Sequence, residues 1–127
     1  MARQNAKLYV RGRFVRDPRV VDAKDDSGRK FVFGRLAVDQ PYIDPRGDTK
    51  SSTLYVELKA FEPALVQALL DGDVRLGTLI EATGTVRLER SEYEKDGEKR
   101  ESHSIAVILD DPEHHSVAIE AHAKATA

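Results

Sequence analysis

Four aromatic residues of this chain lie close to Lys and Arg residues, a combination suited to contacts with bases and phosphates. Tyr55 and Phe61 fall six residues apart, Tyr42 precedes them, and Tyr93 follows in a charged segment. Exposed rings offer stacking surfaces worth about 1–3 kcal/mol per base, and cations follow the phosphates of a single strand. The alternative for each ring is ordinary packing, with Phe61 beneath a helix and the tyrosines half-buried in strands. The candidate binding residues are Tyr42, Tyr55, Phe61, Tyr93, Arg35, Lys50, Lys59, Arg87 and Arg90.

The sequence lacks the residue patterns of an enzyme. There is no glycine-rich phosphate loop with a lysine and no His-Glu-x-x-His. Ser102 and His103 are neighbours on an expected strand, so they would point to opposite faces and could not form a nucleophile–base pair. Adjacent His114 and His115 in a polar tail are more typical of solvent exposure than of a zinc site, which needs four ligands. We therefore expect neither catalysis nor a metal or cofactor.

The stretch that carries Tyr55 and Phe61 alternates strictly between apolar and other residues. This period of two over Leu54–Phe61 predicts a strand with one buried face, and the aromatics fall on the other face. The period then changes. Glu62-Pro63 begins a helix and Asp71-Gly72 ends it. Its apolar stripe consists of Leu65, Val66, Leu69 and Leu70.

The remaining strands are predicted from similar alternation. They are expected at Lys7–Arg16, Lys30–Asp39, Leu79–Arg90 and Ser102–Asp110, with a short return segment at Arg19–Ala23. The strand Leu79–Arg90 should face inward through Ile80, Ala82, Gly84, Val86 and Leu88. We expect a long polar loop at Gln40–Ser52 and a charged hairpin at Ser91–Glu101 with Asp96-Gly97 at its tip.

The order of these elements predicts the fold class. Five strands with one helix between the third and the fourth, and glycines inside three strands, indicate a small, strongly curved sheet. The all-β architecture with this order is the OB-fold, a five-stranded barrel with a helix covering one end. A two-sheet sandwich is the alternative. The predicted domain covers residues 1–110, and residues 111–127 form a short tail.

Composition sets further limits. A length of 127 residues suggests one domain, and the chain contains no cysteine, so disulfides and thiolate metal sites are excluded. There is no signal peptide or membrane-spanning run, which fits a cytoplasmic protein. The net charge is −2, yet residues 1–100 are slightly basic and residues 101–127 are acidic. An ordinary solvated surface explains this weak basic excess equally well.

Several segments together resemble the bacterial single-stranded DNA-binding proteins over about residues 6–110. The resemblance begins with LYVRGRFVRDPR at 8–19 and continues with FVFGRLAVDQPY at 31–42. It is densest at TLYVELKAF, residues 53–61. Leu70-Asp71-Gly72 and the later Gly84-Thr-Val-Arg match the end of the helix and the fourth-strand pattern. The order and spacing of these segments carry the resemblance, because no single one is specific.

The resemblance implies a non-catalytic OB-fold protein that binds single-stranded DNA without sequence preference, in replication, recombination or repair at the nucleoid. Tyr42, Tyr55 and Phe61 fall on stacking positions, and Tyr93 lies about two residues later than the usual aromatic. The chain has no tryptophan, so weaker binding per base is expected. The resemblance also implies a homotetramer, with a dimer as the alternative, and the first strand is a plausible pairing surface through Tyr9, Arg11 and Arg13.

Two observations leave other functions open. The sequence ends in EAHAKATA without the acidic-hydrophobic tip that recruits replication and repair proteins in the family, which suggests a specialised member. The body is also nearly neutral. A protein–protein adaptor of a replication or primosome-like complex is therefore the second hypothesis, and a small enzyme is the third. Salt separates the first two, because binding through phosphates weakens steeply with salt.

Overall fold

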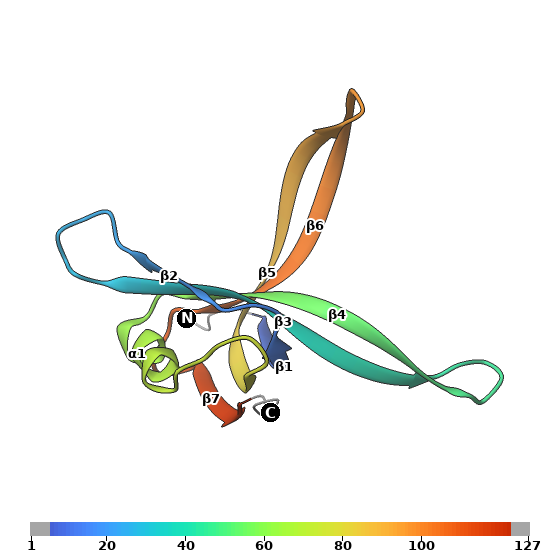
Figure 1. Ribbon diagram of the computed structural model, residues 1–127, viewed down its shortest axis with the longest axis horizontal. Coiled ribbons are helices and arrows are strands. Elements are labelled where there is room, and N and C mark those ends of the chain that lie inside the picture. Colours follow the sequence, from blue (N-terminus) through green and yellow to red (C-terminus); the bar gives the residue numbers. More distant parts are fainter. Residues whose placement is uncertain (1–5, 123–127) are drawn as a thin grey trace, which may run out of the picture.

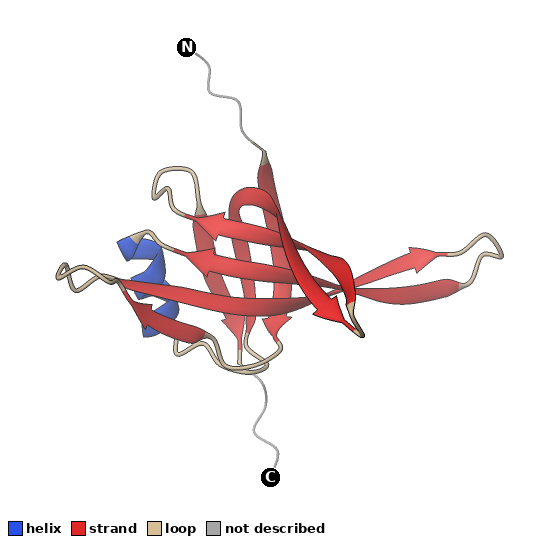
Figure 2. Ribbon diagram, turned by 90° about the horizontal axis from the view of Figure 1, so that it is seen from above, coloured by secondary structure: helices blue, strands red, loops and turns tan. Residues whose placement is uncertain are grey.

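The structure is a computed structural model that describes residues 6–122. These residues form seven strands and one helix (Figure 2). The elements are β1 (Lys7–Phe14), β2 (Arg19–Asp22), β3 (Lys30–Ile43), β4 (Thr49–Ala60), α1 (Pro63–Asp71), β5 (Leu79–Lys95), β6 (Glu98–Leu109) and β7 (Ser116–Ala121).

Five strands close into a barrel. Their order is β1-β3-β4-β6-β5, and pairing of β1 with β5 completes the ring. All pairs are antiparallel except β4–β6. This closed ring is the OB-fold, so the predicted five-stranded barrel is confirmed and the two-sheet sandwich was wrong. The single helix lies between the third and the fourth barrel strands, as predicted.

The predicted apolar faces form the core. Alternate residues of β4 are buried from Val56 to Ala60, and Val10 and Phe14 of β1 are buried against them. Helix α1 covers one end of the barrel with Leu65, Val66 and Leu69. It begins as predicted, because the Glu62 carboxylate accepts a hydrogen bond from the Leu65 N–H at 2.9 Å. Gly72 follows its last residue.

A mid-strand glycine is required where the barrel turns sharply. A Cβ on Gly84 would lie 2.3 Å from the backbone oxygen of Ile108 on the neighbouring β6. A Cβ on Gly12 would lie 2.7 Å from the backbone oxygen of Ala37. These close approaches confirm that glycine permits the curvature, since any side chain would push the strands apart.

Two long hairpins extend from the barrel in different directions (Figure 1). The expected loop at Gln40–Ser52 was wrong, because β3 and β4 continue their ladder from Val32↔Ala60 to Ile43↔Thr49 without a register shift. Polar residues suffice here because backbone hydrogen bonds, not core burial, form the ladder. The hairpin predicted at Ser91–Glu101 is confirmed, with positive φ at Asp96 (55°) and Gly97 (79°). We call these hairpins the β3–β4 arm and the β5–β6 arm.

The inward position predicted for Leu88 was wrong. Leu88 belongs to the same alternating series as the buried Ile80 and Ala82, but 71% of its surface is exposed. At this point β5 leaves the barrel for the β5–β6 arm. Near the start of β5 the residues of this series are covered by the core, but Leu88 lies beyond it.

The segment after Pro112 contains a strand and a buried histidine. Strand β7 pairs with β5 through Ile80↔Ile119 and Ala82↔Val117, and it packs beside α1. The expectation that His115 is exposed was wrong, since only 8% of it is exposed. Its Nδ1 lies 3.1 Å from the backbone nitrogens of both Asp110 and Asp111, and its Nε2 lies 3.2 Å from Thr85 Oγ1. His115 thus fastens the turn between β6 and β7 to β5.

Candidate nucleic-acid interface

The outer face of β3 and β4 gathers four of the nine aromatic and cationic candidates. Val32, Leu36, Val56 and Leu58 point into the core, so the alternate residues point outward. The register places Phe33 opposite Lys59 and Arg35 opposite Glu57. We call this surface the β3–β4 face. Its outward residues are Phe31, Phe33, Arg35, Tyr55, Glu57, Lys59 and Phe61.

Tyr55 stands at the arm end of the β3–β4 face, paired with Arg35. The Arg35 guanidinium carbon lies 4.7 Å from the centre of the Tyr55 ring, within cation–π distance. Tyr55 remains 49% exposed. Arg35 Nε lies 3.6 Å from the Glu57 carboxylate but is buried without a hydrogen-bond partner among the described residues. Arg35 is therefore only partly satisfied by the protein.

Tyr55 and Arg35 also line a cavity of about 480 Å³ where the two arms separate. Leu88 and His103 of the β5–β6 arm line its other side. An exposed leucine beside a tyrosine ring gives this cavity an apolar wall, and Arg35 gives it a cation. The volume lies in the range of sites that hold small ligands.

Phe61 lies at the other end of the β3–β4 face, in a cluster with two phenylalanines that the sequence analysis did not select. Its ring contacts the Phe31 ring edge to face, with centres 5.2 Å apart, and the Phe33 ring with centres 5.7 Å apart. The cluster is partly buried. The signal in the sequence was the stretch KFVF, in which both faces of the strand are apolar.

The cations of this surface are partly neutralised by carboxylates. Lys59 Nζ lies 2.7 Å from Glu89, which projects from β5 across β6. Arg87 lies on the same side of β5 as Glu89 and is exposed. The β3–β4 face therefore combines aromatic rings with a small net positive charge.

Tyr42 and Lys50 lie on the β3–β4 arm, directly opposite each other. Strict alternation from Tyr55 places both on the other side of the ribbon from Tyr55 and Arg35, in the series that faces the core within the barrel. Tyr42 is 50% exposed because the ribbon has left the barrel there. A single strand that touches both tyrosines must therefore follow the twist of the arm.

Tyr93 and Arg90 lie on the β5–β6 arm. Tyr93 lies opposite Arg100 and points to the same side of β5 as Arg87. Arg90 points to the other side of β5 and forms ion pairs with Glu92 and Glu101. The two arms diverge in Figure 1, so the structure places Tyr93 and Tyr42 on separate extensions. The candidates thus divide into a central group on the β3–β4 face and one group on each arm.

These surfaces can stack bases and contact phosphates. Among residues 6–122, no three side chains of the His, Cys, Asp and Glu types gather as potential metal ligands. Within the same residues, no helix has the length and apolar character needed to cross a bilayer.

Comparisons with known proteins identify the fold. No family model matches the chain, and no curated protein matches it in sequence. The structure is similar to a Plasmodium falciparum SSB in complex with ssDNA, with 18% identity, 95% of this chain and 98% of that chain covered, and a TM-score of 0.69. It is also similar to a small single-stranded DNA-binding protein from Streptomyces coelicolor, with 18% identity, coverages of 93% and 96%, and a TM-score of 0.64.

A third similarity covers only part of the other protein. For the single-stranded DNA-binding protein of Thermus aquaticus the identity is 20% and the TM-score 0.57, and the match covers 91% of this chain and 50% of that chain. At identities of 18–20%, the similarity shows the fold alone. This chain therefore has the OB-fold that these single-stranded DNA-binding proteins share.

Proposed function

We propose that this protein binds single-stranded DNA without sequence preference, as a non-catalytic binding protein. Bases stack on exposed rings of the β3–β4 face and the arms, and cations contact the phosphates. In OB-folds the surface of the second and third barrel strands, with the adjoining loops, binds oligonucleotides. Here those strands are β3 and β4, and the aromatic residues lie on that surface.

The observation that carries the proposal is the Arg35–Tyr55 pair. A tyrosine ring with one face against a cation, half of its surface exposed, and a cavity beside it is arranged to receive a base.

The comparisons support the same proposal. One similar structure contains ssDNA and the others are single-stranded DNA-binding proteins by name. We extend the proposal to a role in replication, recombination or repair, in the cytoplasm at the nucleoid, and to a homotetramer or dimer of these barrels. The outer face of β1, with Tyr9 exposed, is the candidate surface for self-association.

The test is tyrosine fluorescence during titration with poly-dT. The chain has four tyrosines and no tryptophan to mask them. Stacking of bases on Tyr55, Tyr42 or Tyr93 should quench the signal, and the apparent affinity should fall steeply between about 50 and 300 mM salt. Arg75→Gln, in the exposed turn between α1 and β5, is the control variant and should retain binding.

The second candidate function is a protein–protein adaptor. It is favoured by Glu57 and Glu89, which neutralise cations of the β3–β4 face. An absence of quenching at low salt would reject the DNA-binding proposal and leave the adaptor. Binding of a protein partner through Tyr55 should hardly respond to salt.

A further inference from the structure

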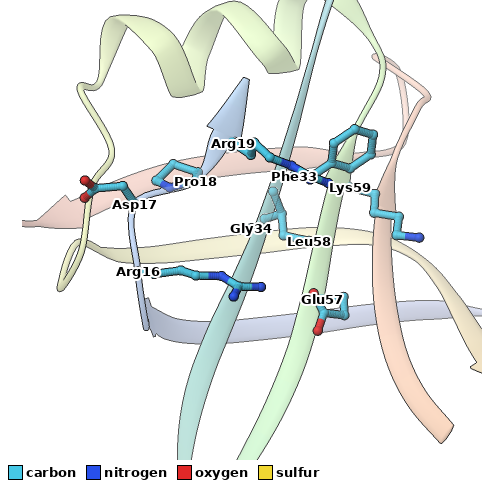
Figure 3. Close-up of a pocket in the computed structure, with 9 residues that line it drawn as sticks. All are labelled: Arg16, Asp17, Pro18, Arg19, Phe33, Gly34, Glu57, Leu58 and Lys59. Atoms are coloured by element: carbon cyan, nitrogen blue, oxygen red, sulfur yellow. The ribbon is translucent and has the colours of Figure 1, made fainter. Parts of the chain in front are cut away.

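A cavity at the β2 end of the β3–β4 face is not among the candidate positions from the sequence. It has a volume of about 590 Å³ and lies between the segment before β2 and the outer side of β3 and β4. Phe33 lies in it with Arg19 beside the ring, and Arg16 and Lys59 line other parts of the cavity (Figure 3). We call it the Phe33 cavity. It combines one aromatic ring with three cations.

The two arginines are available to a ligand. In the part of the chain that the structure describes, Arg16 and Arg19 take part in no ion pair. Both are exposed. The Arg19 guanidinium carbon lies 5.9 Å from the centre of the Phe33 ring, so the charge already stands beside the aromatic surface.

The carboxylates that border the cavity are engaged elsewhere. Asp17 accepts a hydrogen bond at 2.8 Å from the backbone N–H of Leu76 and points away from Phe33 in Figure 3. Glu57 lies 3.6 Å from Arg35. The interior of the cavity is therefore electropositive, which suits a phosphate and disfavours a carboxylate-rich peptide.

Phe33 is held in place for stacking. The edge-to-face contact with Phe61 fixes its ring on one side. On β3 it is two residues from Arg35, which corresponds to about 7 Å along the strand. The Phe33 cavity is thus continuous with the Arg35–Tyr55 pair, and one extended ligand can contact both.

We propose that the Phe33 cavity binds one nucleotide of the same single strand that stacks on Tyr55. The base lies on the Phe33 ring, and the phosphate lies between Arg16 and Arg19. This inference rests on the proposed function and extends the binding path from the arms to β2. The occupant is a nucleotide within a strand, since the cavity opens onto the β3–β4 face where that strand would run.

Two variants test the proposal by affinity for oligo-dT. Arg16→Gln with Arg19→Gln should weaken binding about tenfold or more and reduce the salt slope by about 0.7, for the one phosphate that the two arginines contact. Phe33→Leu keeps an apolar side chain against Phe61 but removes the stacking surface, and it should weaken binding about tenfold. Arg75→Gln removes a charge from the exposed turn between α1 and β5, away from the β3–β4 face, both arms and the outer face of β1, and should keep the wild-type slope.

Photocrosslinking gives a direct readout that does not depend on affinity. An oligo-dT that carries 5-iododeoxyuridine should crosslink to the wild-type protein at Phe33, identified by mass spectrometry. An unchanged melting temperature would show that Phe33→Leu remains folded. If Phe33→Leu is unfolded, the crosslink to the wild-type protein and the arginine variant decide the test.

The outcomes separate this inference from the proposed function. Quenching of Tyr55 by bound DNA, without crosslinks at Phe33 and with wild-type affinity in the arginine variant, would overturn the cavity and leave DNA binding intact. Absence of oligo-dT binding by the wild-type protein would overturn both.

Discussion

The guanidinium of Arg35 lies over the ring of Tyr55, 4.7 Å from its centre, although the two side chains come from different strands. Arg35 lies opposite Glu57, and Tyr55 lies opposite Ala37. The contact is therefore diagonal, a spacing within reach of long side chains on one sheet face. It leaves the other side of the ring for a base and holds the ring in position before any ligand arrives.

Replacement of Tyr55 should reduce DNA binding more than any other single tyrosine change. Tyr55→Ala should cost about 1–3 kcal/mol of binding free energy, about 5- to 150-fold in affinity, because a stacking surface is lost. Tyr55→Phe should bind nearly as well as the wild type. Equilibrium titration with oligo-dT measures both. Leu76→Ala, an exposed apolar residue in the turn between α1 and β5, is the control, and an equal loss there would contradict the assignment.

Phe61 should be important for stability as well as for binding. Its contacts with Phe31 and Phe33 join the end of β4 to β3, so Phe61→Ala should lower the free energy of unfolding by about 1–3 kcal/mol, less than for a fully buried phenylalanine. Urea denaturation measures this change. Tyr55→Ala is the matched comparison and should lower it by less than about 0.5 kcal/mol. Equal losses in the two variants would show that Phe61 is not part of the cluster in solution.

The sequence predicted the barrel because burial imposes alternation. In Leu54–Ala60 every second residue faces the core, and an apolar period of two indicates a strand, not a helix. The helix was equally clear because Pro63 and Gly72 mark its ends. The continuation of β3 and β4 through Gln40–Ser52 was missed, because outside the barrel the ladder depends on backbone hydrogen bonds, which leave no apolar pattern.

The candidate site was only partly predictable. Tyr55 and Lys59 share a face by parity along one strand, and the sequence shows that directly. The proximity of Arg35 depends on the β3–β4 register, which the wrong loop assignment concealed. With that register, parity also separates Tyr42 from Tyr55. Arg19 meets Phe33 only because β2 pairs with β3, a contact that no local pattern specifies.

The turn before β3 should depend on pH through Asp25. Hydrogen bonds from the Ser27 hydroxyl and backbone N–H, together with Arg29, lower the pKa of Asp25 from 3.8 to about 2. The ionised form is favoured in the folded state, so this contribution to stability is present above about pH 4 and is lost as the pH falls toward 2. Ser27→Ala should raise the pKa of Asp25 toward 3.8, as measured by NMR titration of its carboxyl carbon. Ser51→Ala, on the β3–β4 arm, should leave it unchanged.

The glycine inside β5 should tolerate no side chain. Because a Cβ at residue 84 would meet the Ile108 oxygen at 2.3 Å, Gly84→Ala must displace β6 or β5. We expect a loss of about 1–3 kcal/mol or more in the free energy of unfolding, measured by chemical denaturation. Thr83→Ala, at the adjacent half-buried position, is the control and should cost less. A Gly84→Ala variant as stable as the wild type would mean that the barrel closes less tightly than described.

The protonation of His115 follows from its partners. The backbone N–H groups of Asp110 and Asp111 both donate to Nδ1, so that nitrogen carries no proton, and Nε2–H donates to Thr85. The Asp110 carboxylate also lies 3.3 Å from Nδ1. It could accept a hydrogen bond from Nδ1 only if Nδ1 carried a proton, and the two backbone N–H groups would then lose their acceptor. Long-range ¹H–¹⁵N NMR spectra should therefore show the Nε2–H tautomer.

His115→Ala would leave two partly buried backbone N–H groups without their side-chain partner and release the turn before β7. We expect a loss of about 1–3 kcal/mol in the free energy of unfolding, with faster amide exchange in β7 than in the barrel. His114→Ala, at the exposed neighbouring position, is the matched control and should leave β7 protected. Equal exchange in the two variants would show that β7 is held to β5 by its own ladder and not by His115.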